Sequence, residues 1–81
     1  MYSTYILWSE KLQKYYIGYT DNLSRRITEH NAGKSTYTKL GIPWTLMYHE
    51  EFISKAEAMR REREIKNRKS KKYIETIINK M

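Results

Sequence analysis

Residues 2–20 read YSTYILWSEKLQKYYIGYT, and this stretch is the strongest indication of the fold. Two runs rich in β-branched and aromatic residues, 2–8 and 14–19, flank the polar SEKLQ, a pattern that predicts a β-hairpin. Because side chains alternate along a strand, Tyr5 and Tyr16 share a face only where paired residue numbers sum to an odd value. We predict such a register, for example residue 5 opposite residue 16, with an even loop such as Ser9 to Leu12.

A helix and a third strand are predicted after the hairpin. Thr20 or Asp21 is suited to cap a helix that begins at Asn22, and Gly33 is suited to end it. A loop with glycine and proline follows, and residues 44–52 (WTLMYHEEF) then have the composition of a strand.

Two more helices are predicted at the C-terminal end. Ser54 and Glu57 have the spacing of a capping box, which starts a helix that runs to about Lys69. Ser70 is suited to cap a last helix, whose apolar residues recur at helical spacing: Ile74, Ile77, Ile78 and Met81. The order β-β-α-β-α-α predicts a single α/β domain of the α+β type over residues 1–81, with helices flanking a small three-stranded sheet. The position of the third strand in that sheet is not determined by the sequence.

The composition points toward nucleic acid. The chain has 81 residues, 16 Lys and Arg against 9 Asp and Glu, and no cysteine. The lack of cysteine excludes disulfides and thiolate metal sites, and we find neither a membrane span nor a signal peptide, so we expect a cytoplasmic location. A basic chain with eight tyrosines favours a nucleic-acid partner. The alternative is that the net charge of +7 serves only solubility.

One acidic residue in the second predicted helix lies on the wrong face for a solvated charge. With Ala58 at 0° and about 100° per residue, Glu62 falls at about 40°, within the apolar stripe that includes Ile65. Glu57 and Glu64 fall on the charged face instead, where each precedes an arginine by four residues. Glu62 is therefore predicted to face the protein.

A carboxylate in that position needs a counter-charge or a metal ion. On the first predicted helix, Arg26 and His30 flank the inward stripe and offer a guanidinium and an imidazole. Two interpretations stay open at this point. Glu62 is either a structural partner of an arginine from the first helix, or part of a site that it shares with Arg26 and His30.

These residues match the pattern of a known family. Ser-Thr-Tyr at residues 3–5 is followed after ten residues by Tyr-Ile-Gly at 16–18. The chain resembles the GIY-YIG nuclease superfamily, in which Gly-Ile-Tyr and Tyr-Ile-Gly lie on adjacent strands. The family's arginine matches Arg26, its Arg-x-x-x-His spacing matches His30, and its glutamate matches Glu62. The first motif departs from the pattern by keeping only the tyrosine, and the likeness is greatest to the short, stand-alone bacterial branch.

The resemblance implies a metal-dependent endonuclease that hydrolyses phosphodiester bonds in branched, flapped or damaged DNA. It implies that Glu62 holds one divalent ion, Mg²⁺ or Mn²⁺, and that Arg26 contacts the phosphoryl oxygens. Tyr5 and Tyr16 would orient or deprotonate the attacking water, and His30 would relay a proton or contact phosphate. Each residue also has a structural alternative: packing for the tyrosines, a surface position for Arg26, and a favourable helix-end charge for His30.

A basic segment forms a second candidate site. Residues 60–72 hold eight Lys and Arg against two Glu, a net charge of +6. We predict sequence-independent phosphate contacts from seven of these side chains: Arg60, Arg63, Lys66, Arg68, Lys69, Lys71 and Lys72. The alternative is a solvated helix face with ion pairs between successive turns.

The expected partner is a nucleic acid, with DNA favoured over RNA, and no membrane. We expect no appended DNA-reading domain, which leaves substrate specificity to a protein partner. A non-catalytic nucleic-acid-binding module with the same fold is the main alternative function. A protein-interaction adaptor is a third, and the basic segment argues against it.

Overall fold

The computed structural model describes residues 1–79 and confirms the predicted order of elements, with one short 3-10 turn (η1) added before the third strand. The elements are β1 (Tyr2–Ser9), β2 (Lys14–Thr20), α1 (Leu23–Asn31), η1 (Lys39–Gly41), β3 (Trp44–Phe52), α2 (Lys55–Arg68) and α3 (Lys71–Ile78). Within the described residues, no helix is both long and apolar enough to cross a membrane.

The sheet has the order β2-β1-β3, and both neighbours of β1 are antiparallel to it. The first strand is therefore central, which places Tyr5 in the middle of the sheet. The third strand, whose position the sequence left open, pairs with β1 and shifts register between Ile6 and Leu7.

As predicted, the numbers of paired hairpin residues sum to an odd value. The example pair was wrong, because the partner of Tyr5 lies two residues further along β2 than residue 16. Tyr5 lies opposite Gly18 and Leu7 lies opposite Tyr16, so Tyr5 and Tyr16 are diagonal neighbours on one face. The difference arises because β1 continues to Ser9, whose buried hydroxyl donates to the carbonyl of Gly41 and accepts from the amide of Leu12. The loop is thus 10–13, even in length as predicted but further along the chain.

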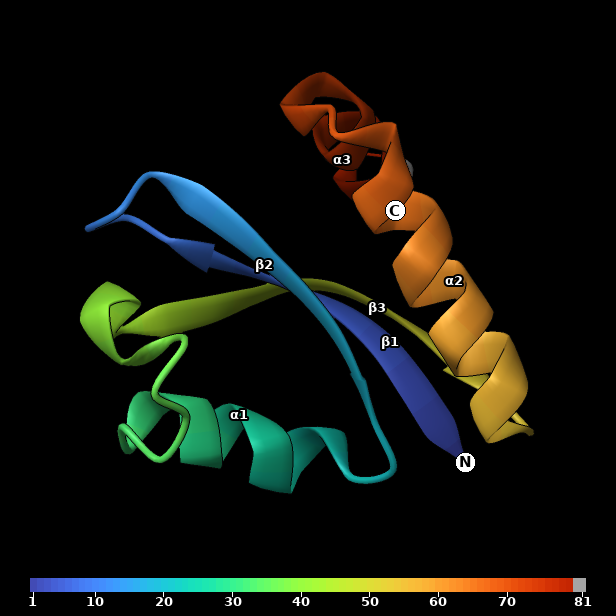
Figure 1. Cartoon of the computed structure of the whole chain (residues 1–81), viewed down its shortest axis with the longest axis horizontal. Helices are drawn as coiled ribbons and strands as arrows, with labels where there is room; N and C mark the ends of the chain where they lie inside the picture. The colour runs from blue at the N-terminus through green and yellow to red at the C-terminus, as the bar shows by residue number, and fades with distance from the viewer. Residues whose placement is uncertain (80–81) are drawn as a thin grey trace.

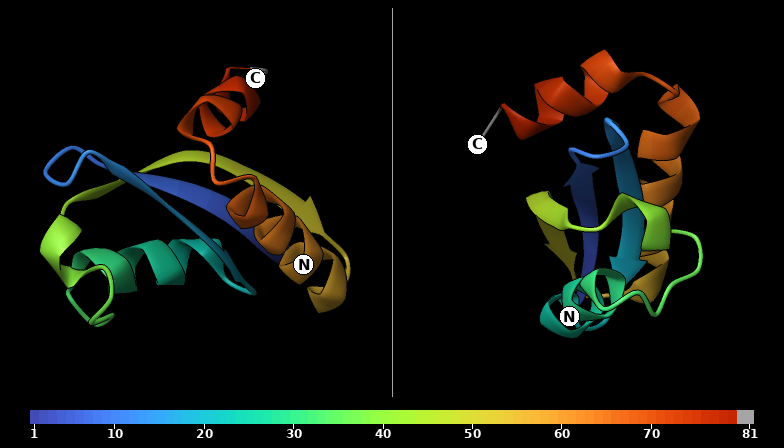
Figure 2. Two further views of the ribbon diagram at one scale, coloured as in Figure 1. Left: turned by 45° about the horizontal axis from the view of Figure 1, so that its top comes forward. Right: turned by 90° about the vertical axis from the view of Figure 1, so that its left-hand side faces the viewer.

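The helices cover both faces of the sheet (Figures 1 and 2). On the α2–α3 side, Ile6 and Ile17 pack with isoleucines of the two helices. On the α1 side, Tyr5, Leu7 and Trp44 form the buried cluster, against which hydrophobic side chains of α1 pack. Each apolar cluster stays small, as expected for a chain of this length.

The helix ends follow from their capping residues, with one correction. Asn22, not Thr20 or Asp21, caps α1: it is extended and its side chain accepts from the amide of Arg25, so the helix begins one residue later than predicted. Gly33, at φ +77°, follows the end of α1 in the left-handed conformation expected of it. The capping box of Ser54 and the cap of Ser70 are confirmed. The predicted inward position of Met81 lies outside the described residues.

Candidate active site

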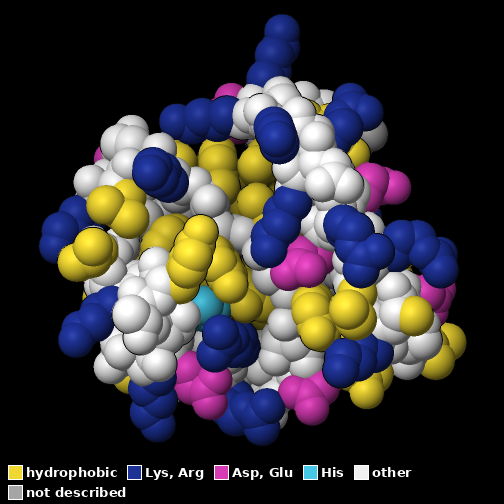
Figure 3. Space-filling view, in the orientation of Figure 1, with side chains coloured by type: hydrophobic (Ala, Val, Ile, Leu, Met, Phe, Trp, Pro, Cys, Tyr) yellow, Lys and Arg dark blue, Asp and Glu magenta, His cyan; other side chains and the backbone are white. Residues whose placement is uncertain are grey.

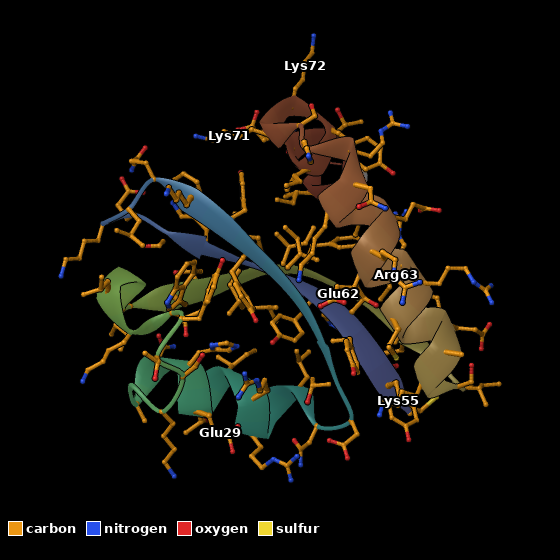
Figure 4. All side chains as sticks on the ribbon, in the orientation of Figure 1. Glu29, Lys55, Glu62, Arg63, Lys71 and Lys72 are labelled. Atoms are coloured by element: carbon orange, nitrogen blue, oxygen red, sulfur yellow. The ribbon has the colours of Figure 1, made fainter. Side chains whose placement is uncertain are left out.

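Four of the five motif residues line one open groove between α1 and α2, and the fifth lies beneath it. The groove encloses about 560 Å³, and Tyr5, Tyr16, Arg26 and Glu62 all contribute to its wall. Figure 4 shows Glu62 pointing from α2 toward the strands and Glu29 on α1 across the groove. The fold therefore brings together side chains from two strands and two helices.

Tyr5 reaches the groove because Gly18 lies opposite it. A Cβ atom on Gly18 would stand 2.5 Å from the Tyr5 hydroxyl oxygen, closer than any real contact. The glycine thus leaves room for the phenol to extend across β2, and the ring centroid of Tyr16 lies 6.3 Å from that of Tyr5. This close approach is the physical reason for the glycine in the Tyr-Ile-Gly triplet.

The phenol of Tyr5 is a weak acid in this environment. Burial and the neighbouring Tyr16 raise the pKa of Tyr5 to about 12, although Arg26 acts in the opposite direction. Tyr5 therefore remains protonated at neutral pH in the free protein. Of its two expected roles, orienting a water molecule is compatible with this pKa, while deprotonating that water is not.

The guanidinium of Arg26 faces the groove and is held by Glu29. One of its nitrogens lies 3.2 Å from a Glu29 carboxylate oxygen, and both side chains are partly exposed. Burial acts to lower the pKa of Arg26, but the adjacent Tyr5 and Glu29 outweigh it and raise that pKa. A charged, planar donor that stays partly accessible is suited to bind phosphoryl oxygens.

His30 is fully buried beneath the groove. Its Nε2 lies 3.0 Å from the Tyr5 hydroxyl, and its Nδ1 lies 2.7 Å from the hydroxyl of Thr38. The expected phosphate contact of His30 is therefore wrong for this structure, because both nitrogens are engaged inside the protein. His30 does lie in the last turn of α1, but the alternative of a favourable cation there is opposed by burial and by Arg26, which lower its pKa; the proton-relay role remains a prediction.

The buried imidazole predicts a pH-dependent stability. Burial and the adjacent Arg26 lower the pKa of His30, while Glu29 acts weakly in the opposite direction. The stabilisation by neutral His30 should be complete above the unfolded pKa of about 6.5 and should be lost as the pH falls from there through the lowered folded pKa. One proton limits the slope to about 1.4 kcal/mol per pH unit.

This prediction is tested by denaturant unfolding between pH 7.5 and 5, with His49, which is exposed on β3, as the control. We expect His30→Gln to flatten the pH dependence and His49→Gln to leave it in place. Titration of both imidazoles by NMR gives a second test that needs no variant. A His30 pKa at or above the ordinary histidine value of about 6.5 would contradict the prediction.

Glu62 faces the groove as predicted, but its partner is not the arginine of the other helix. Its side chain is 20% exposed, and one carboxylate oxygen lies 3.2 Å from Nζ of Lys66, one helical turn later. The interpretation of Glu62 as the structural partner of Arg26 is therefore wrong, since Arg26 pairs with Glu29. Glu62 retains an accessible carboxylate beside the motif tyrosines.

Comparison with known proteins identifies the family of the chain. Residues 1–74 match the family model of the GIY-YIG catalytic domain. The chain belongs to the GIY-YIG family. This family is one of nucleases, and GIY-YIG nucleases typically use a divalent metal ion.

Several similar proteins carry the name UPF0213. A UPF0213 protein of Staphylococcus haemolyticus is 60% identical over 52 residues, which is 63% of this chain and 63% of the relative. A UPF0213 protein of Halobacterium salinarum is 55% identical over 53 residues, 64% of this chain and 69% of the relative. The match thus spans less than two thirds of the length of the staphylococcal relative.

A solved structure confirms the GIY-YIG fold of the chain. The solution NMR structure of a UPF0213 protein from Bacillus halodurans is 37% identical and has a TM-score of 0.61. The comparison covers 98% of this chain and 84% of that one.

The donor groups of the groove are compatible with a hydrated divalent ion. Within residues 1–79 no three His, Cys, Asp or Glu side chains are clustered as a metal cage. Mg²⁺ does not require one, because it usually keeps several waters and binds through one or two carboxylates plus substrate phosphates. Glu62 supplies such a carboxylate, whereas Glu29 in the same groove is paired with Arg25 and Arg26.

The basic segment does not form a single surface around the groove. Lys66 lies beside Glu62 and Tyr16, while Lys71 and Lys72 project from the start of α3, at the far end of the molecule in Figure 4. Arg60 lines a separate pocket with acidic residues, on the side of α2 that faces β3. The seven residues therefore fall into different surroundings, and phosphate contacts from each remain a prediction.

The expected ion pairs on the charged face of α2 are wrong. Glu57 turns back to Ser54 in the capping box, and Arg61 bridges Glu50 of β3 and Glu64. Arg68 stacks 4.2 Å from the ring centroid of Tyr73 instead. The reason is that Glu50 of β3 and Tyr73 of α3 offer the two arginines other partners, while Glu57, Glu64 and Arg68 remain exposed.

Several residues of the GIY-YIG groove were not expected from the sequence. They are Tyr2, Tyr19, Asp21, Arg25, Glu29 and Lys55. The sequence could have predicted Lys55, because it precedes Glu62 by seven residues, about two helical turns, and therefore shares its helix face. Alternation along β2 places Tyr19 on the opposite face from Tyr16, but it still reaches the groove because β2 is an edge strand.

Proposed function

We propose that this chain is a metal-dependent endonuclease that hydrolyses phosphodiester bonds in structured or damaged DNA. The observation that carries the proposal is the convergence of Tyr5, Tyr16, Arg26 and Glu62 on one open groove, with neutral His30 bonded to Tyr5 beneath it. Structural packing alone does not account for four partly polar side chains facing the same accessible space.

Arg26 is assigned to the phosphate. Its fork of donors would bind two phosphoryl oxygens in place of the Glu29 carboxylate it contacts in the free protein. That exchange keeps the guanidinium paired in both states, so it is held in position before substrate arrives. Charge on the phosphate grows in the transition state, and a fixed cation stabilises it there.

The two tyrosines are assigned different tasks. Tyr5 keeps its proton, and its hydrogen bond to His30 holds the phenol in the groove. The contact with the attacking water falls to Tyr16, which faces the same space. In hydrolysis the water oxygen bonds to phosphorus and loses a proton, the P–O ester bond breaks, and the leaving oxygen takes up a proton, so that the water's lost proton balances the one gained.

Glu62 is assigned to the divalent ion, Mg²⁺ or Mn²⁺. When bound, such an ion stabilises charge on the scissile phosphate and on the leaving oxygen. The Glu62 carboxylate is partly exposed, and the ion would compete there with Nζ of Lys66, which lies 3.2 Å away.

One observation favours a second candidate, a non-catalytic nucleic-acid-binding module. The three carboxylates that line the groove, those of Asp21, Glu29 and Glu62, are each paired with a basic side chain, and the pKa of Tyr5 is raised rather than lowered. A cleavage screen separates the two candidates. Linear, flapped, branched and single-stranded DNA are incubated with Mg²⁺ or Mn²⁺, and the Glu62→Gln variant is the control. Product formation by the wild type alone supports the nuclease, and binding without product supports the module.

Binding to duplex DNA is predicted to depend steeply on salt and only weakly on sequence. Log affinity should fall by about 0.9 per log unit of salt for each phosphate neutralised. We expect replacement of Lys71 and Lys72 by Gln to reduce that slope, and replacement of Lys55 in the groove to reduce it as well. Fluorescence anisotropy at several salt concentrations measures the slope.

The control for the salt experiment is Lys11→Gln in the hairpin loop. It removes one positive charge outside both the basic segment and the groove, and is compared with the single replacements of Lys71 and of Lys72. The basic segment would have no part in binding if Lys71 and Lys72 changed the slope no more than Lys11 does.

A further inference from the structure

An exposed aromatic surface lies next to the groove, and the assigned mechanism does not use it. Tyr37, in the segment between α1 and η1, is 88% exposed. Its ring centroid lies 6.4 Å from that of Tyr16, and the two planes meet at 53°. Figure 3 shows hydrophobic side chains, a class that includes tyrosine, gathered around a hollow on this face of the molecule.

The exposure of Tyr37 is not explained by a loose loop. The next residue, Thr38, is almost fully buried, and its hydroxyl lies 2.7 Å from Nδ1 of His30. The carbonyl of Thr38 accepts a hydrogen bond from the indole nitrogen of Trp44. The backbone is therefore anchored in the core directly beside Tyr37, while the ring contributes almost nothing to that core.

Two hollows open between Tyr37 and the strands. The smaller encloses about 150 Å³ and has Tyr15, Tyr16, Tyr37 and Trp44 in its wall. The larger lies between Tyr37, Tyr16 and Lys66. A flat aromatic ligand would stack on the aromatic rings that line both hollows, and every nucleobase has a π-face that can stack in this way.

The charges around the two hollows favour an anionic ligand. Lys14 lines the smaller hollow and Lys66 the larger, and no Asp or Glu among the described residues lines either one. The ammonium of Lys66 lies 5.9 Å from the centroid of the Tyr16 ring. Aromatic faces with lysines at their border fit a base and its flanking phosphates.

Tyr16 connects this surface with the groove, because it lines both. We propose that Tyr37 and Tyr16 hold an unpaired nucleobase beside the phosphate that is cleaved. The preferred substrate class is then nucleic acid with a single-stranded nucleotide at the cleavage site, such as a flap or a gapped junction. This inference rests on the proposed function for the position of the cleaved phosphate, but the base-binding surface can be tested without cleavage.

The test measures binding in the Glu62→Gln background, so that no substrate is consumed. The probes are a labelled flap, the same flap with abasic residues in its single strand, and a blunt duplex of equal length. Loss of one base–aromatic stack corresponds to about a 5- to 150-fold loss of affinity. We expect Tyr37→Ala to lose affinity in that range for the flap, and to change binding of the abasic flap and the duplex by less than twofold.

The controls separate stacking from other effects. Tyr37→Phe keeps the ring and should bind the flap like the parent. Leu40→Ala removes another exposed hydrophobic side chain, 72% exposed in η1, and should have no effect. Equal losses on flap, abasic flap and duplex would overturn the inference, as would no loss on any of them.

Cleavage by the otherwise unmodified chain is measured in parallel. Cleavage without a Tyr37 effect on binding would overturn the inference and leave the proposed function. Tyr37-dependent binding without cleavage would support the base-binding surface and overturn the proposed function. No binding to any of the probes would overturn both.

Discussion

Replacement of Glu62 by Gln is expected to reduce DNA cleavage by about 10³-fold or more while leaving the fold intact. The carboxylate is the donor assigned to the divalent ion, and such an ion contributes several kcal/mol to the transition state of phosphoryl chemistry. Glutamine keeps the size of the side chain but not its charge. Removal of a negative charge beside the phosphate should also leave binding unchanged or tighten it.

The stability change of Glu62→Gln should be small, because the side chain makes one partly exposed ion pair with Lys66. Such pairs between successive helical turns contribute about 0.3–0.5 kcal/mol, so the melting temperature should fall by no more than about 4 °C. Thermal melts with and without Mg²⁺ measure this change in melting temperature. We expect Mg²⁺ to stabilise the parent by mass action and to stabilise the variant less.

The matched control is Glu64→Gln, which removes the same charge from an exposed position on α2 that does not line the groove. It should cleave at nearly the parental rate. The catalytic assignment would be wrong if Glu62→Gln lost much stability equally with and without Mg²⁺ and the parent cleaved no substrate. Glu62 would then be a structural residue.

Most elements of the fold were predictable because their signals are local. The capping box of Ser54 and Glu57 and the cap of Ser70 involve contacts within a few residues, and the structure has them as predicted. The third strand was predicted at its observed bounds, residues 44–52, because the glycine and proline before it mark where it begins.

The hairpin register and the position of β3 depend on contacts across the fold. Ser9 lengthens β1 because it bonds to Gly41, 32 residues later, and no pattern within 2–20 contains that partner. Likewise, the pairing of β3 with β1 depends on which strand edge α1 and its connection leave open. The parity of the register was still predictable, because it needs only the alternation of side chains.

The candidate site was predictable in its members but not in its pairings. Helical spacing placed Glu62, Arg26 and His30 toward the protein, and the structure brings all three to the groove or beneath it. Spacing within one helix does not show how two helices sit relative to each other. The pairs Glu62–Lys66 and Arg26–Glu29 were therefore not predicted, and pairing of Glu62 with an arginine of the first helix was left as one of two open interpretations.

Replacement of Arg26 by Ala is the second change with a large expected effect. Loss of one fixed donor to a developing oxyanion typically costs about 10²- to 10³-fold in rate, and cleavage should fall by that amount. Unlike Glu62→Gln, this variant should also bind DNA more weakly, since a phosphate contact is lost. Arg26→Lys should regain part of the binding but little of the cleavage, because an ammonium lacks the planar fork. Cleavage rates and anisotropy titrations on the same flap measure both quantities.

Arg25→Ala is the matched control, since Arg25 also lines the groove but is more exposed and pairs with Asp21. It should weaken binding with little effect on the cleavage rate of bound DNA. A second readout follows from the charge of Arg26, which lowers the pKa of the buried His30. In Arg26→Ala the His30 pKa should rise, and in Arg25→Ala it should stay. An unchanged His30 titration in Arg26→Ala would mean that Arg26 does not act on the Tyr5–His30 pair, and that its effect on cleavage arises elsewhere.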